Sequence, residues 1–260
     1  MASTWKAFRI QVRVVGALLM REVLTRYGRH NIGFMWLFVE PMIFTLGVAS
    51  LWSLAGLHRK LPIPVVAFAV TGYSSVLLWR NMATRSINSL EPNLALLYHR
   101  YVKIIDLFAA RMILEGIGAV ISFVVLCACF IFFGVMQWPQ DVPKIVLAIV
   151  LLAWFGASLA LFLGCLSMRS EVIEKLWHPA TYLMFPLSGA AFMVDWLPES
   201  VQRLILLLPM VHGVELLRDG YFGSSVHTHY RLDYMAGFCL VLTALGLAAE
   251  RIVGRTIAPE

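Results

Sequence analysis

Charged residues are scarce in this sequence. Asp, Glu, Lys and Arg make up 14% of its 260 residues and hydrophobic residues 60%, whereas a soluble domain averages about 25% charged and about 45–50% apolar residues. So few charges cannot cover the surface of a water-soluble protein, and the composition therefore predicts an integral membrane protein. The net charge of +6 does not indicate nucleic-acid binding, because the basic residues lie beside apolar segments, where they orient membrane helices.

Motifs of common enzymes and metal sites are absent as well. The sequence contains no GxxxxGKS/T loop, which excludes ATP binding through a P-loop, and no HExxH or GxSxG motif. Its four cysteines lie inside apolar runs and form no CxxC pair. We interpret them as small packing residues rather than as a disulfide or metal framework.

One group of residues has some character of a metal site. His212, Glu215 and Arg218 are spaced i, i+3, i+6, which puts them on roughly one face of a helix, and His227 and His229 follow. A zinc site is one interpretation, but a single His-x-x-Glu is a weak signal. A hydrogen-bonded cap for outer helices explains the residues better, so we predict no metal and no enzymatic activity.

Six apolar segments dominate what is present. A crossing needs ~20 largely apolar residues as helix, and we predict spans at about 32–54, 64–82, 104–135, 144–168, 176–195 and 234–250. Lys and Arg before the first span place its start in the cytoplasm, so six spans leave both termini there. Residues 197–222 are too short for a crossing before Pro209, and they predict re-entrant helices on the outer face.

Residues 1–31 form a separate unit before the first span. Apolar residues recur there at i+3 and i+4 with basic residues beside them, namely Trp5, Phe8, Val12, Val15, Leu19 and Val23 with Lys6, Arg9 and Arg13. This pattern is typical of an amphipathic helix in the cytoplasmic interface, while packing on the protein itself is the alternative, and both can hold. The predicted fold is therefore an all-α polytopic membrane protein, with an interfacial helix at 1–31 and a six-helix transmembrane domain at 32–255.

Two sets of polar residues fall inside the predicted spans. Arg111 and Glu115 stand at i, i+4, which predicts a buried ion pair, with a substrate contact as the alternative. Glu40-Pro41 interrupts the first span, where the proline can kink the helix and the carboxylate should face protein or a water-filled cavity.

Short motifs in a fixed order make the sequence similar to a known family. They are Arg21-Glu22, Arg26-Tyr27-Gly28, Gly33, Trp36, Glu40-Pro41, Arg85-Ser86-Ile87, Glu91, Asn93, Val102-Lys103, Asp106, Ala110-Arg111, Leu114-Glu115, Val211-His212, Glu215 and Arg218. Each motif is weak alone, but together they span residues ~20 to ~235 and are fairly specific. The chain resembles the permeases of type-2 ABC exporters, most closely the capsule polysaccharide export permeases of Gram-negative bacteria.

The resemblance implies a half-transporter in the bacterial inner membrane. Such a chain would pair with a second copy of itself and with two copies of an ATP-binding subunit, which would hold ATP and Mg²⁺, so this chain itself would bind no cofactor. Its cargo would be a lipid-linked capsular polysaccharide, and its further partners membrane lipids and periplasmic or outer-membrane export proteins, with no nucleic acid. Alternatives are the same architecture exporting O-antigen, teichoic acid or a small drug, and a membrane enzyme or scaffold without an ATPase.

These expectations assign roles to three groups of residues. A substrate channel, with basic members for an anionic lipid phosphate, is predicted at Arg26, Arg29, Trp36, Tyr73, Trp79 and Arg85. The ATPase interface is predicted at Asn88, Glu91, Asn93, Arg100, Arg169, Glu171 and Glu174. The outer re-entrant helices are assigned His212, Glu215 and Arg218.

Overall fold

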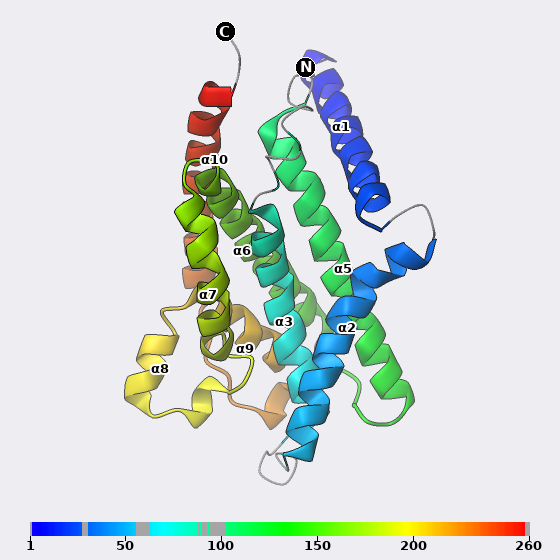
Figure 1. Ribbon diagram of the computed structural model, residues 1–260. Coiled ribbons are helices and arrows are strands. Elements are labelled where there is room, and N and C mark those ends of the chain that lie inside the picture. The colour runs from blue at the N-terminus through cyan, green and yellow to red at the C-terminus, as the bar shows by residue number, and fades with distance from the viewer. Residues whose placement is uncertain are drawn as a thin grey trace.

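All the regular secondary structure of this protein is helical in the residues that its computed structural model describes, which are 2–27, 31–55, 63–87, 89, 93 and 102–257. The α-helices are α1 (Ala2–Tyr27), α2 (Asn31–Leu54), α3 (Val65–Ser86), α5 (Ile104–Phe132), α6 (Val142–Ser167), α7 (Glu171–Leu187), α8 (Glu199–Ile205), α9 (Pro209–Phe222) and α10 (Leu232–Ile257). Both chain ends lie at one end of the bundle, and α8 and α9 lie at the other (Figure 1).

Each predicted span contains one helix. By length and composition, α5, α6 and α10 are each apolar enough to cross a membrane within the described residues, and α8 with α9 forms a pair bent by 108° that is a broken span or a re-entrant loop. The predicted fifth span was placed too late, because α7 begins at Glu171, directly after Ser170, and ends at Leu187. Gly189, with φ of +83°, follows in the left-handed region and prevents the continuation to residue 195.

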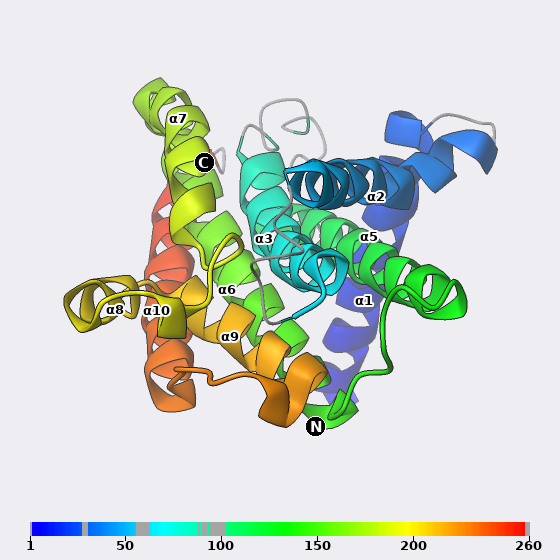
Figure 2. The same ribbon diagram turned by 90° about the horizontal axis from the view of Figure 1, so that it is seen from below.

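The centre of the bundle is α3. It packs against α2, α5, α6 and α9, and Figure 2 shows it between α2 and α7 at the centre of the molecule. Its polar stretch Thr71–Ser75 is buried throughout. Close approach depends on small residues: a Cβ added at Gly156 of α6 would lie 2.8 Å from Trp79 Cα.

Helix α1 packs along α5 on one of its faces. Leu18 is buried with Leu107 and Phe108 in an apolar cluster, and Gln11 Nε2 donates a hydrogen bond to the buried Asp106 carboxylate. Of the predicted stripe, Val15 and Leu19 pack against the same cluster. Trp5, Phe8 and Val12 are exposed, as are the basic residues Lys6, Arg9 and Arg13. The structure therefore contains the protein-packed face that was the alternative, together with a second face that remains available to a membrane.

Candidate functional site

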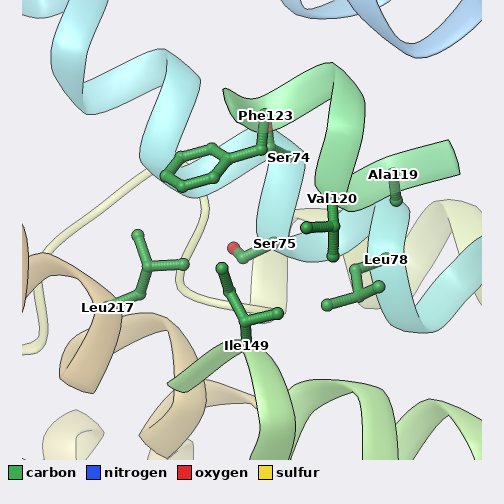
Figure 3. Close-up of a pocket in the computed structure, with 8 residues that line it drawn as sticks. All are labelled: Ser74, Ser75, Leu78, Ala119, Val120, Phe123, Ile149 and Leu217. Atoms are coloured by element: carbon green, nitrogen blue, oxygen red, sulfur yellow. The ribbon is translucent and has the colours of Figure 1, made fainter. Parts of the chain in front are cut away.

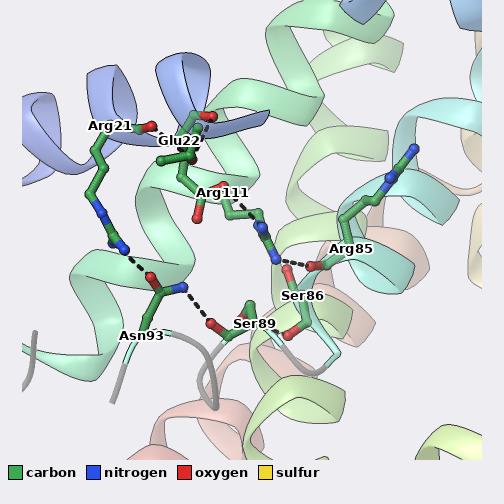
Figure 4. Close-up of polar contacts among 8 residues, drawn as sticks. Arg21, Glu22, Arg85, Ser86, Ser89, Asn93 and Arg111 are labelled. Atoms are coloured by element: carbon green, nitrogen blue, oxygen red, sulfur yellow. Dashed lines mark hydrogen bonds and ion pairs between the residues drawn. The ribbon is translucent and has the colours of Figure 1, made fainter. Parts of the chain in front are cut away.

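A polar pocket lies where α1, α3 and α5 meet, toward the end of the bundle that holds both termini. We label that end the inner end and the opposite one the outer end. Its volume is about 470 Å³, and it is lined by Arg21, Glu22, Thr25, Thr84, Arg85, Ile87, Asn93 and Arg111. Figure 4 shows Arg21 of α1 reaching toward Asn93 and Arg111 of α5 reaching toward the backbone of Arg85, while the Arg85 side chain points away from Arg111. We call it the inner arginine pocket, since three guanidinium groups line it.

Arg111 holds two neighbouring helices against α5. Its Nη2 lies 2.9 Å from Glu22 Oε2 of α1, and its Nη1 donates to the backbone oxygen of Arg85 over 2.8 Å. The predicted ion pair between Arg111 and Glu115 is wrong in its partner, because Arg111 points toward α1 rather than along its own helix. Charge-assisted bonds of this kind are stronger than neutral ones, so Arg111 is a strong polar link between α1 and α5.

Asn93 completes a second polar chain in the pocket. Arg21 Nη1 donates to Asn93 Oδ1 at 2.7 Å, and Asn93 Nδ2 donates to the backbone oxygen of Ser89 at 2.7 Å. Ser89 in turn donates from Oγ to the backbone oxygen of Ser86 (Figure 4). Asn93 is 6% exposed and its side chain contacts α1, while its assignment to the ATPase interface stays a prediction.

Arg85 faces α2 from the end of α3. Its Nη2 lies 3.2 Å from Glu40 Oε1, and the two side chains are 39% and 36% exposed. Glu40 therefore faces protein, as its position inside an apolar span predicted. In the described part of the site, Arg21, Arg85 and Arg111 stand against Glu22 and Glu40, which leaves one positive charge in excess.

The predicted aromatic channel residues separate into two groups. Trp79 has no exposed surface and packs edge-on against Phe155 at 5.7 Å, and Tyr73 is 8% exposed against Phe185 at 5.5 Å. Both belong to the core, because α3 is enclosed by its neighbours, and the prediction that they line a channel is corrected. Trp36 of α2 is 54% exposed, and its contact with substrate stays a prediction.

Other predicted residues lie at the inner end or outside the described part of the chain. Arg169 and Glu171 are exposed and Glu174 half-buried at the start of α7. The remaining predicted residues, or their side chains, lie outside what the structure describes, and they are Arg26, Arg29, Asn88, Glu91 and Arg100.

The interior beside the polar stretch of α3 is closed. The cavity drawn in Figure 3 lies between Ser74, Ser75 and apolar side chains of α5, α6 and α9, and it measures about 10 Å³. A single water needs about that much space. Ser74 Oγ is buried beside it and has no hydrogen-bond partner among the described residues. This cavity has no room for a sugar, so the polar residues of α3 do not form a wide passage here.

A second polar cluster fixes the outer end of the bundle. Arg218 is fully buried, and its guanidinium donates to the backbone oxygens of Gly189 and Phe192, each at 2.6 Å, and of Ala190 at 2.7 Å. It also lies 3.9 Å over the Phe68 ring. Arg218 thereby caps the carbonyl groups that follow α7.

Glu215 and His212 bind two further outer segments. Glu215 accepts hydrogen bonds from the backbone N–H groups of Val194 at 3.3 Å and His229 at 3.0 Å. His212 Nδ1 accepts from the backbone N–H of Arg231, which leaves the proton on Nε2, 2.9 Å from the backbone oxygen of Leu206. These contacts are those of a hydrogen-bonded cap. Within the described residues no group of three His, Cys, Asp or Glu side chains is arranged to hold a metal.

The sequence reasoning missed two members of the inner arginine pocket. The predictions include Arg21 only in a motif, and Arg111 in a motif and in a pair with Glu115 that had a substrate contact as its alternative, whereas both line the pocket. The available signal was the Arg21-Glu22 dipeptide at the end of an amphipathic helix, because adjacent opposite charges there invite pairing with a neighbouring helix.

Comparisons with known proteins match most of the chain. The family model described as ABC-2 type transporter covers residues 13–222. The chain is 43% identical to the capsule polysaccharide export inner-membrane protein CtrC of Neisseria meningitidis serogroup B, over 99% of this chain and 97% of the relative. It is 38% identical to BexB of Haemophilus influenzae, a protein of the same description, over 98% of this chain and 96% of the relative. It is 26% identical to the polysialic acid transport protein KpsM of Escherichia coli, over 94% of this chain and 95% of the relative.

Proposed function

This chain belongs to the ABC-2 type transporter family, and we propose that it is the permease that exports a capsular polysaccharide across the bacterial inner membrane. The observation that carries the proposal is the full-length similarity to capsule export permeases, at 43% identity over 99% of the chain. In this family ATP hydrolysis belongs to a separate subunit, which agrees with the missing P-loop. The chain is thus a transport subunit and not an enzyme.

A second copy of the chain would supply the other half of the polymer pathway. The cavity beside α3 holds only about one water, so a wide passage has to form outside the core of one protomer. Helices α2 and α7 carry apolar side chains on their outer surfaces, such as Trp36, Leu51, Leu176 and Tyr182, which are 54–72% exposed. These surfaces support a pathway formed between two copies.

Six spans and two cytoplasmic termini follow from the same proposal. The crossings would be α2, α3, α5, α6, α7 and α10, with α8 and α9 as the outer re-entrant pair. Both termini lie at the same end of the bundle (Figure 1), which an even number of crossings requires. Reporter enzymes fused after Glu260 and inserted near Ser225 should report opposite sides of the membrane; the same side for both would contradict six crossings.

Helix α1 would lie in the cytoplasmic interface as a unit distinct from the domain at 32–255. The exposed Trp5 and Phe8, which stack at 6.0 Å, would enter the headgroup region, and Lys6 and Arg9 would contact anionic headgroups. The opposite face of α1 is held to α5 by Leu18. The helix would therefore border the route by which a lipid-linked substrate reaches the protein.

The inner arginine pocket would receive the anionic phosphate of the lipid anchor. Its volume of about 470 Å³ and its excess of one positive charge suit a phosphate group. Arg21 is the guanidinium best placed to change partner, because it is bound to the neutral amide of Asn93 rather than to a carboxylate. Arg85 stays in the predicted role, with Arg21 and Arg111 in addition to the arginines expected from the sequence.

The ATP-binding subunits would contact the start of α7, at the same end of the bundle as the termini. Arg169 and Glu171 are exposed there, Glu174 is half-buried, and Trp177 Nε1 donates to Thr84 Oγ1 of α3 at 3.0 Å. A push on α7 would thus reach α3 directly. Two ATP-binding subunits per pair of permeases would bind ATP and Mg²⁺, and periplasmic export proteins would meet the outer end.

Complementation tests the cargo and the pocket together. A capsule-forming bacterium that lacks its own permease should regain surface polysaccharide when it expresses this chain with its ATP-binding subunit. Changing Arg21 and Arg85 to Gln should lower export by about tenfold or more, a loss of about 1.4 kcal/mol or more, at an unchanged membrane level. The control changes Arg251 and Arg255, exposed on α10 and not lining the pocket, to Gln. Equal export losses in both pairs would contradict the pocket, and no complementation by a stable wild-type complex would contradict the cargo.

A further inference from the structure

The outer end of the bundle contains a second open pocket, which the proposed transport function does not use. It measures about 520 Å³ and lies between α8, the segment before α10 and the start of α10. Leu206, Leu207 and Tyr234 form its apolar part, and Arg203, Thr228 and Arg231 stand among its polar lining. We call it the outer pocket. Its elements lie at the end opposite the termini (Figure 1).

Hydrogen bonds and a ring contact hold the apolar wall of the outer pocket in place. Tyr234 donates from its hydroxyl to the backbone oxygen of Leu207 at 2.7 Å, and its ring meets the His212 ring edge-on at 5.2 Å. His212 is itself held between the backbone of Leu206 and that of Arg231. An aromatic ring fixed in this way loses little conformational freedom when a ligand packs against it.

The rim of the outer pocket offers donors and acceptors in balance. Arg231 lies 2.5 Å from Asp233, His229 lies 3.3 Å from Asp195, and Arg203 lies 3.8 Å from Glu199. Each basic side chain thus has a carboxylate beside it, so the rim carries no surplus of positive charge. Nearby, Tyr230 donates to Asp219 at 3.0 Å, and burial together with that bond raises the pKa of the Tyr230 phenol, which stays uncharged.

This arrangement selects among the ligands that could reach an outer membrane surface. A phospholipid phosphate needs guanidinium groups that are free of competing carboxylates, and the rim has none such among its described residues. A pyranose presents C–H groups on one face, which pack on an aromatic ring, and hydroxyl groups at its edge, which bind donors and acceptors alike. A mostly apolar wall with a few polar groups at its rim is typical of small-ligand sites.

We propose that the outer pocket binds a pyranose unit of the exported glycan, with one sugar face on the Tyr234 ring and its hydroxyl groups on the Thr228, Arg203 and Arg231 rim. The inference rests on the proposed function, because only a transported polymer would bring sugar to this face. The pocket is open and small, so binding is weak and reversible. Such a site would hold the leaving chain at the outer face without trapping it.

A binding experiment on the whole chain tests the site independently of export. The purified chain in lipid nanodiscs is mixed with soluble tetramers of sialic acid, of alternating hexuronic acid and hexosamine, and of glucose, and saturation transfer to the sugar ring protons is measured by NMR. Thr228→Trp fills the pocket from its rim. Ser225→Trp, in the same outer segment and exposed but not lining the pocket, is the matched control.

The expected result is saturation transfer to at least one tetramer that Thr228→Trp weakens by about tenfold or more and Ser225→Trp leaves unchanged. Equal thermal stability of the two variants shows that the pocket, and not the fold, was altered. No transfer to any tetramer, or equal transfer in both variants, would overturn the inference. A second contrary result would come from glycerol phosphate. If its NMR signals broaden with the wild type but not with Thr228→Trp, while no tetramer binds, the pocket belongs to lipid headgroups and the inference is overturned. Restored surface polysaccharide in the complementation assay with no tetramer bound would overturn the pocket alone.

Discussion

The contact between Glu22 and Arg111 gives the sharpest test of how α1 is held. The two residues are 89 apart in sequence, their charged atoms lie 2.9 Å apart, and their side chains are 15% and 18% exposed. We expect Glu22→Gln to destabilise the protein by about 1.5–3 kcal/mol, the range for a hydrogen bond to a charged group. Arg111→Gln should cost about 3–5 kcal/mol, because it also removes the bond to the backbone oxygen of Arg85.

The size of this effect follows from two opposing terms. Two unit charges 2.9 Å apart attract by about 6 kcal/mol at an effective dielectric constant of about 20. Desolvation of two largely buried side chains offsets much of that attraction. We therefore expect a coupling energy of about 1.5–3 kcal/mol between Glu22 and Arg111. An exposed ion pair should have a much smaller coupling energy.

Reversible unfolding in mixed detergent micelles measures the coupling energy. The cycle contains the wild type, Glu22→Gln, Arg111→Gln and the double variant. Its control is the Glu171–Lys175 pair, whose side chains are 85% and 73% exposed at 3.2 Å, and which should couple by about 0.5 kcal/mol or less. A cysteine at Leu18, 7% exposed in the wild type, should become reactive toward maleimide only when the first pair is broken.

Equal coupling in the two pairs would refute the reasoning. It would mean that Arg111 does not hold α1 against α5 and that the apolar contacts of Leu18 suffice. A cysteine at Leu18 that reacts at the same rate in all four proteins would lead to the same conclusion. Either result would favour an interfacial helix without a fixed site on the bundle.

Three further predictions concern the outer cluster and the ATPase contact. Gly72→Ala should destabilise the protein by about 3 kcal/mol or more, because its Cβ would lie 2.7 Å from Arg218 Nη2. The control, Gly47→Ala, has open space around it and should be neutral or stabilise the protein by about 0.5–1 kcal/mol. Unfolding in micelles compares the two variants, and equal effects would contradict the packing around Gly72. Arg218→Lys should lose about 2–3 kcal/mol, since one ammonium cannot serve three carbonyl groups as the planar guanidinium does; unchanged unfolding would contradict this. Reversing Glu171 and Glu174 to Lys should lower co-purification of the ATP-binding subunit by about tenfold at an unchanged membrane level, and an intact complex would place the interface elsewhere.

Much of the helical architecture could be predicted from hydropathy alone. An apolar run of span length leaves few alternatives to helix in a membrane, so α2, α3, α5, α6 and α10 begin within a few residues of the predicted boundaries. The start of α7 was missed because Glu171 and Glu174 read as a polar loop, although acidic residues in a first turn favour a helix start.

The side-chain contacts could not be predicted in the same way. Spacing within one helix favoured Glu115 as the partner of Arg111, but the partner comes from α1, and such long-range pairing depends on how whole helices cross. Trp79 and Tyr73 were assigned to a channel because aromatic residues and hydroxyl groups suit sugars. They are buried instead, because α3 has neighbours around it, and burial on every face leaves no signal in its polar sequence.

The placement of the polar clusters indicates where transport movements occur. The inner and outer clusters fix the two ends of the bundle, and close contacts at Gly72 and Gly156 hold α3 against the outer segment and α6. Separating those helices would expose buried polar groups and open cavities, each at a cost of several kcal/mol. Among the described residues, in contrast, the links of α1 to α5 and Asn93 are one ion pair, two side-chain hydrogen bonds and one apolar cluster. We therefore expect the core of each protomer to move as a rigid body, with α1 and the surface between two copies as the parts that change.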